Sequence, residues 1–185
     1  MTDSNSIEKS NIQIDDDREL LDIYDCNAIP TGKTIIRGTP IKSGEYSLSV
    51  HLFIYNSKGL FLVQKRSYKK RSLPGIWSVT CGAVSAGEDS ISAGIREAKE
   101  EVGLDITKEQ FEFIDKIKRR HSFVDIFFIK SNFEISKLVL QEDEVDSVKL
   151  ASPKELLNMI IASSNANSTY LASITRAMKE RGLIQ

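Results

Sequence analysis

The segment from Gly82 to Leu104, GAVSAGEDSISAGIREAKEEVGL, constrains this chain more than any other part of the sequence. Asp89 or Ser90 can cap the start of a helix, and Gly103 suits the left-handed position just past its end. Between these signals the residues recur at helical spacing. The segment therefore predicts one helix that begins near residue 90 and stops at Gly103.

The predicted helix has two chemically different sides. Small and aliphatic residues form an apolar stripe: Ile91, Ile95, Ala98 and Val102. At roughly 100° per residue, three glutamates fall within an arc of about 100° on the other side: Glu97, Glu100 and Glu101. Arg96 can offset part of their repulsion, and Glu88 in the preceding loop can lean over the same side. Four carboxylates beside one arginine form a suitable cluster of oxygen ligands for magnesium or manganese.

The same glutamates could instead form an ordinary solvated helix face, because Glu and Lys are strong helix formers. Residues at fixed offsets around them argue against that interpretation: Gly82, Gly87, Glu88 and Gly103. The whole segment resembles the Nudix box, the signature of enzymes that hydrolyse a diphosphate linked to another moiety. The only departure is Ala98, which is small where a bulkier aliphatic residue is usual. The resemblance implies an α/β fold, the Nudix α/β/α sandwich with a mixed sheet.

The resemblance also suggests roles for the charged residues. A diphosphate resists attack mainly because its oxygens are already negative, and a bridging divalent ion removes that barrier. The predicted ligands of Mg²⁺ (or Mn²⁺) are Glu97, Glu100, Glu101 and, in a supporting role, Glu88. Arg96 is expected to hold a carboxylate in place. The general base could be Glu97, or an acid of the loop 142–144 with Glu144 the nearest match, although that loop could also be a solvated turn. The predicted catalytic residues are thus Glu97, Glu100, Arg96 and Glu144.

Two basic turns could attract an anionic substrate. One contains Lys65, Arg66, Lys69, Lys70 and Arg71, from which Arg66, Lys65 and Arg71 are the predicted substrate-binding residues. The other is Arg119-Arg120-His121, and both turns could equally be solvated. His51 lies in an apolar stretch without a second histidine near it, which favours a hydrogen-bonded core residue over a metal ligand. Trp77 is expected to pack under the first basic loop, with base stacking as the alternative.

A finer resemblance covers residues 18 to 160. The stretch EYSLSVHLFIYNSKGLFLVQKRS, followed by LPGIWSVTCGAV, looks like the branch near isopentenyl diphosphate isomerase. In that enzyme a catalytic cysteine precedes the box glycine, where Cys81 stands here. However, Ser47 and Ala83 occupy positions where its metal-binding histidines would fall, and its box is degenerate whereas this one is complete. We therefore expect a Mg²⁺-dependent hydrolase of an organic diphosphate. The alternatives are an isopentenyl diphosphate isomerase and a non-catalytic nucleotide sensor.

Composition sets wider limits. A chain of 185 residues fits one domain of ordinary size, and we expect a tail at 1–17 followed by a single domain at 18–185. The formal net charge of -1 gives no reason to expect a nucleic-acid polymer or a membrane as partner, so a small diphosphate substrate, with a homodimer as an option, is expected. Two cysteines form no disulfide framework, which favours a reducing cytoplasm.

The remaining chain reads as strands with few helices. Extended segments are expected at Glu19–Asp25, Lys33–Gly38, Ser47–Tyr55, Leu60–Arg66, Trp77–Cys81, Phe111–Lys118, Phe123–Lys130 and Val145–Leu150. A turn at 29–32 should separate the first two. Ser152-Pro153-Lys154-Glu155 is a capping box that opens a helix to about Ile161, and a last helix should run from about Thr169 to Arg181. This pattern is typical of a sheet between two helical layers.

Overall fold

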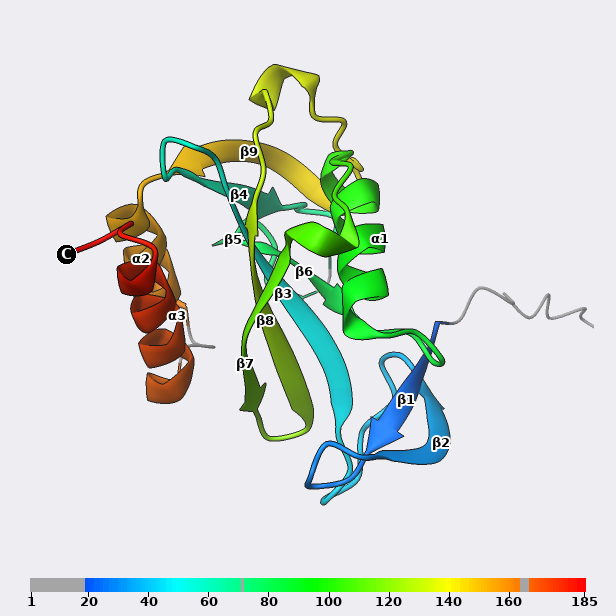
Figure 1. The fold of residues 1–185 in the computed structure, drawn as a ribbon. Helices are drawn as coiled ribbons and strands as arrows, with labels where there is room; N and C mark the ends of the chain where they lie inside the picture. Colours follow the sequence, from blue (N-terminus) through cyan, green and yellow to red (C-terminus); the bar gives the residue numbers. More distant parts are fainter. Residues whose placement is uncertain (1–18, 71, 164–166) are drawn as a thin grey trace, which may run out of the picture.

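The computed structural model describes residues 19–70, 72–163 and 167–185 (Figure 1). The tail expected at 1–17 and Arg71, one of the predicted substrate-binding residues, lie outside the described residues. Within the described ranges, no helix is long and apolar enough to cross a membrane.

A mixed sheet forms the middle layer. Its strands are β3 (Ser47–Tyr55), β4 (Phe61–Arg66), β5 (Trp77–Ser78), β6 (Thr80–Ala83), β7 (Phe111–Lys118), β8 (Ser122–Lys130) and β9 (Val145–Ala151). The main order is β5-β4-β3-β8-β7, with β6 added to β3 and β9 added to β4. β3 and β8 run parallel, and the other pairs are antiparallel. The predicted mixed sheet is therefore confirmed.

The strands β3 and β4 diverge close to the turn that joins them. β3 and β4 pair only at Tyr55 and Phe61, close to the turn that joins them. Further along, β3 pairs with β6 and β4 pairs with β5. The segment Trp77–Cys81 was expected as one strand. The chain instead forms two short strands, β5 and β6, which cross from β4 to β3 with Val79 between them. The sheet opens as a wedge beyond the first pair, and side chains from both of its faces can meet there.

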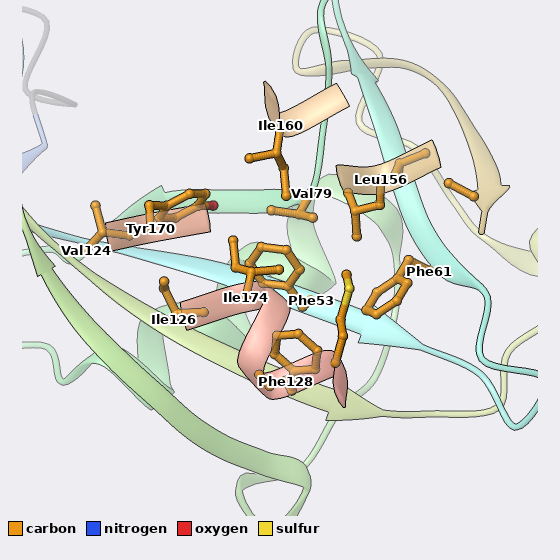
Figure 2. Close-up of a cluster of buried hydrophobic side chains, with 14 of the residues drawn as sticks. Phe53, Phe61, Val79, Val124, Ile126, Phe128, Leu156, Ile160, Tyr170 and Ile174 are labelled. Atoms are coloured by element: carbon orange, nitrogen blue, oxygen red, sulfur yellow. The ribbon is translucent and has the colours of Figure 1, made fainter. Parts of the chain in front are cut away.

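Helices cover both faces of this sheet (Figure 1). α1 (Ser90–Val102) packs on one face, where Ala98 and Val102 join a core cluster with Leu52. α2 (Pro153–Ala162) and α3 (Ser168–Glu180) cover the other face. There, Figure 2 shows their side chains packed around aromatic residues of the sheet: Leu156, Ile160, Tyr170 and Ile174 against Phe53 and Phe128. This arrangement is the α/β/α sandwich that the sequence predicts.

The ends of the helices agree with the predicted caps. The Asp89 side chain accepts a hydrogen bond from Ser92 N, and Gly103 takes the left-handed conformation with φ of 68°. Ser152 and Glu155 form the predicted capping box at the start of α2. Short 3₁₀ turns, η1 (Lys108–Gln110) and η2 (Ile135–Lys137), lie in the connections on either side of β7 and β8.

The N-terminal hairpin differs from the prediction in its turn. β1 (Leu20–Tyr24) pairs with β2 (Pro30–Ile36), so the strand begins at Pro30 where a turn was expected. The chain reverses earlier because the Asp25 carboxylate accepts hydrogen bonds from the backbone N–H groups of Asn27 and Ile29. An isolated antiparallel β-bridge between Leu21 and Ser85 connects the hairpin to the main domain.

The orientation of α1 is a second correction. The sequence predicts that Glu97 and Glu101 lie on the side opposite the apolar stripe, yet both are buried, at 7% and 5% exposure. Ile91 and Ile95 of the predicted stripe are only partly buried. The helix packs on the sheet through small residues and its glutamates face the opening of the wedge, so the acidic side is an inner side. Glu100 alone among the three glutamates is exposed.

Candidate active site

The junction between β6 and α1 places one carboxyl group directly against the backbone. A Cβ atom added at Gly82 would stand 1.9 Å from Glu97 Cδ and 2.0 Å from Glu97 Oε1. Such approaches are shorter than any real Cβ contact, so only a glycine leaves room for this carboxyl group. The glycine that begins the box is thus explained by the position of Glu97.

Glu101 is held from the other side of the wedge. Gln64 Nε2, on β4, donates a hydrogen bond of 2.7 Å to Glu101 Oε2, and Thr80 Oγ1 donates to Gln64 Oε1 at 3.2 Å. The pKa of Glu101 is raised to about 7, mainly by burial and also by the negative charges of Glu97 and Glu144, while the Gln64 hydrogen bond opposes the shift. Burial also raises the pKa of Glu97. Two buried carboxylates therefore lie close enough to repel each other.

Arg96 binds the remaining carboxylates. Its Nη1 donates to Glu97 Oε1 at 2.8 Å and to Glu100 Oε2 at 3.3 Å, while its Nη2 donates to Glu88 Oε2 at 3.0 Å. The same Nη2 donates to the carbonyl of Ala83 at 3.0 Å, which ties α1 to the end of β6. The positioning role predicted for Arg96 agrees with these contacts, since the guanidinium orients three of the four acids at once.

The acidic residues suit a divalent cation in chemistry and spacing along the helix. Carboxylate oxygens are the ligands that Mg²⁺ and Mn²⁺ prefer, and mutual repulsion of buried carboxylates is relieved by such an ion. Across the described ranges no three acidic, histidine or cysteine side chains converge on a single point, because Arg96 holds three of the carboxylates and Gln64 holds Glu101. In chemistry, the carboxylates of Glu97 and Glu101, with Glu88 and Glu100 nearby, suit a divalent cation.

A pocket of about 350 Å³ lies beside Gln64 and Gly82, the residues that contact these carboxylates. Gln64, Gly82 and Ala83 line it at the carboxylate end, and Leu156, Met159 and Tyr170 line it from α2 and α3. The pocket exists because β3 and β4 diverge, so that it reaches from the inner side of α1 toward the helices on the opposite face.

Two of the predicted substrate-binding residues, Arg66 and Lys65, lie in different places: one in the pocket and one outside it. Arg66 lines the pocket, and its Nε donates to the carbonyl of Ser72 at 2.7 Å. Lys65, next to it on β4, does not line the pocket; its Nζ lies 3.8 Å from Asp146 and 4.8 Å from the centroid of the Tyr68 ring. Strand alternation separates these neighbours onto opposite faces.

The acidic loop at 142–144, before β9, forms ion pairs with the basic loop that follows β4. Lys69 pairs with Asp143 at 2.7 Å, and Lys70 pairs with Glu144. Glu142 and Asp143 are exposed, whereas Glu144 is half-buried and its charge contributes to the raised pKa of Glu101. Glu144 is therefore the member of this loop that faces the carboxylate pair.

His51 forms the floor of the pocket with Cys81, its partner in the β3–β6 register. His51 Nδ1 lies 2.6 Å from the Tyr170 hydroxyl, which confirms the predicted hydrogen-bonded role. Burial and the positive charge of Arg119 lower the pKa of His51 to about 3. Burial, together with the charges of Glu101 and Glu97, raises the pKa of the Cys81 thiol to about 12, so the thiol is protonated near neutral pH. Trp77 packs against the core and also lines the pocket.

Sequence reasoning missed several pocket residues. Arg37 at the end of the N-terminal hairpin and Tyr170 on α3 carried no recognisable signal, because no motif or spacing links them to the box. Arg119 belongs to a basic turn that the sequence singled out, and the alternative that it is purely solvated is wrong, since it lines the pocket.

Comparison with known proteins agrees with this architecture. Residues 45–171 match the NUDIX domain model, which is more than half of the chain. The chain therefore belongs to the Nudix hydrolase family, and the fold and the box together define it as a Nudix-type enzyme. An uncharacterised Nudix hydrolase of Listeria monocytogenes is 35% identical over 140 residues, covering 73% of this chain and 80% of that protein.

Two more distant similarities complete the comparison. The isopentenyl-diphosphate Delta-isomerase of Shigella boydii is 24% identical over 171 residues, covering 88% of this chain and 92% of that enzyme. The crystal structure of DR0079 from Deinococcus radiodurans superposes with a TM-score of 0.67 at 23% identity, covering 85% of this chain and 98% of that one. At this identity the structural likeness shows the common fold.

Proposed function

We propose that the protein hydrolyses the diphosphate linkage of a nucleoside diphosphate derivative or a related organic diphosphate, using Mg²⁺ or Mn²⁺. The observation that supports this most is the pair of buried carboxylates, Glu97 and Glu101, which contact the pocket residues Gly82 and Gln64, beside a pocket large enough for a small organic group. Two buried acids that repel each other destabilise a fold, and a cation that binds both would relieve this repulsion.

In this proposal Glu97, Glu101 and Glu100 hold the metal, with Glu88 in support. A divalent ion bound there would neutralise diphosphate oxygens and lower the pKa of a bound water. Arg96 keeps Glu97, Glu100 and Glu88 in a fixed arrangement by its hydrogen bonds. Arg66 at the pocket wall and Lys65 on the neighbouring surface supply positive charge toward the anionic substrate.

The proposed general base is Glu144, with Glu97 as the second candidate. Glu144 is half-buried and acts electrostatically on Glu101, and its partner Lys70 can release it when a substrate approaches. A base in this loop would come from outside α1, so it could take a proton from water without leaving the metal short of a ligand. Glu97 would combine both tasks.

The test is a comparison of single glutamate-to-glutamine variants. Glu97→Gln and Glu101→Gln should each lower turnover at least about a hundredfold, as loss of a metal ligand does. Glu134→Gln is the matched control, because Glu134 is exposed and its carboxylate pairs with Lys137 at 2.8 Å. Release of phosphate or of a nucleoside monophosphate is measured with magnesium over a panel of organic diphosphates. Near-normal activity of Glu101→Gln would contradict the proposal.

Glu144→Gln separates the two candidate bases. If Glu144 takes the proton, this variant should lose about 10²–10⁴-fold in turnover while its affinity for magnesium stays that of the wild type. If turnover is retained, Glu97 is the remaining base. Magnesium affinity is measured by calorimetry on the same protein samples.

Isopentenyl diphosphate isomerase is the second candidate function. It is favoured by Cys81, which lines the pocket directly before Gly82, and by the similarity to the Shigella boydii enzyme. The raised pKa of the Cys81 thiol and the presence of Ser47 and Ala83 in place of histidines weigh against it. We also propose a cytoplasmic location, supported by the two free cysteines, Cys26 and Cys81.

A further inference from the structure

The pocket contains three arginines from three separate elements: Arg37, Arg66 and Arg119. Two of them, Arg37 and Arg66, already donate hydrogen bonds to other groups of the protein. Arg37 Nη1 donates to Glu19 Oε2 at 2.6 Å, and Arg66 donates to the carbonyl and the hydroxyl of Ser72. These contacts fix both guanidinium groups at the edge of the pocket.

Arg119 differs from the other two. It leaves the turn between β7 and β8, and its guanidinium carbon lies 5.3 Å from the centroid of the Tyr170 ring. Its Nε is buried and has no hydrogen-bond partner, and within the ranges the structure describes its side chain takes part in no ion pair. An arginine fork is an efficient binder of planar carboxylates and of phosphates, and a buried donor without an acceptor is unfavourable.

The described pocket lining offers Arg119 no negatively charged partner. No carboxylate is among the described residues that line the pocket. Tyr170, beneath the guanidinium, is already engaged with His51 Nδ1. The ring of Tyr170 therefore supports the guanidinium by a cation–π contact and leaves its N–H groups directed to other partners.

Arg119 also rests on the helical layer that lies across the sheet from the acids of α1. Tyr170, on which it rests, belongs to α3, whereas Glu97 and Glu101 belong to α1 on the opposite face of the sheet. Many of the residues that line the pocket are apolar, Ile76, Trp77 and Met159 among them. A diphosphate held by the acidic end would extend its organic group along these residues toward Arg119.

We propose that Arg119 determines specificity by binding an anionic group, a carboxylate or a phosphate, at the far end of a substrate whose middle portion is apolar. This rests on the proposed function, because the acidic end is assumed to hold the diphosphate. The structure thereby narrows the substrate class to diphosphates with an apolar spacer and a distal negative charge.

The experiment measures binding, so that it does not depend on turnover. Two series of non-hydrolysable methylenediphosphonate monoesters are titrated by calorimetry with magnesium present: butyl, hexyl and octyl esters, and the same chains ending in a carboxylate. The wild type should bind at least one carboxylate-terminated ester about tenfold to a hundredfold more tightly than its plain counterpart, as a charged hydrogen bond allows. Arg119→Leu should abolish this preference and retain its affinity for the plain esters.

Arg120→Leu is the matched control, since Arg120 is the exposed neighbour in the same turn and does not line the pocket. It should keep the wild-type preference, and thermal melting verifies that both variants are folded. Equal affinity of the wild type for both series, or binding of neither, overturns the proposal. An equal loss for both series in Arg119→Leu also overturns it, because Arg119 would then contact the diphosphate itself. Absence of hydrolysis with the preference intact would instead reject only the proposed function.

Discussion

The carboxyl group of Glu97 occupies the space that a side chain at Gly82 would fill, 1.9 Å from the position of the missing Cβ. This relationship joins the end of β6 to the middle of α1 and sets the place of one buried acid. The second acid, Glu101, is set by Gln64 across the wedge. Each acid is thus positioned by a different strand.

Gly82→Ala should lower turnover by about a hundredfold, because a displacement of roughly 1 Å in a catalytic group can cost that much. The Glu97 side chain can swing away from the new methyl group, so the free energy of unfolding should fall by no more than about 1–3 kcal/mol. Gly182→Ala is the control: φ is 64° there and an added Cβ meets nothing, so it strains the backbone far from the site. Steady-state kinetics and urea unfolding of both variants test this. Full activity of Gly82→Ala would show that Glu97 need not stay in place.

The stability of the metal-free protein should depend on Glu101. Its pKa is raised from 4.5 to about 7, so its contribution to stability is complete below pH 4.5 and is lost as the pH rises through about 7. Glu101→Gln cannot ionise and should gain up to about 3 kcal/mol over the wild type at about pH 8, with a much smaller difference at about pH 5. Urea unfolding in the presence of a chelator at both pH values measures this. A difference independent of pH would mean that Glu101 titrates normally.

Magnesium should stabilise the wild type more than it stabilises Glu101→Gln. A ligand that binds only the native state raises its stability, by about 2.7 kcal/mol at a hundred times the dissociation constant. Millimolar magnesium without substrate should therefore raise the melting temperature of the wild type and leave that of Glu101→Gln nearly unchanged. An unchanged wild-type melting curve would indicate that the site is completed only by substrate phosphates.

Cys81→Ala should keep most of the diphosphate hydrolysis, with a loss of a few-fold from looser packing beside Gly82. The reason is that burial raises the pKa of this thiol to about 12, so little thiolate is available for chemistry. The wild type should also fail to interconvert isopentenyl and dimethylallyl diphosphate. Both reactions are followed on both proteins with magnesium. Isomerisation that is present in the wild type and absent from Cys81→Ala would establish the isomerase instead.

The local pattern of the chain was enough to predict α1 with its caps, most strands and the box. These features depend on residues a few positions apart, so periodicity and capping chemistry reveal them. The turn of the N-terminal hairpin was placed wrongly because the Asp25 carboxylate, and not the predicted turn at 29–32, organises the reversal. The single strand expected at Trp77–Cys81 became two because the chain changes pairing partner at Val79.

By itself, therefore, the sequence determined the family, the sandwich fold and which glutamates cluster on the box helix. All of these follow from the spacing of residues that are close in the sequence. Only the tertiary structure decided that Glu97 and Glu101 are buried, because burial depends on which side of α1 meets the wedge between β3 and β4. It alone also brought Arg119 beside Tyr170, from a turn and a helix that are distant in the chain. A pocket assembled from such distant segments leaves no periodic trace in the sequence, because its residues become neighbours only when strands pair and helices pack.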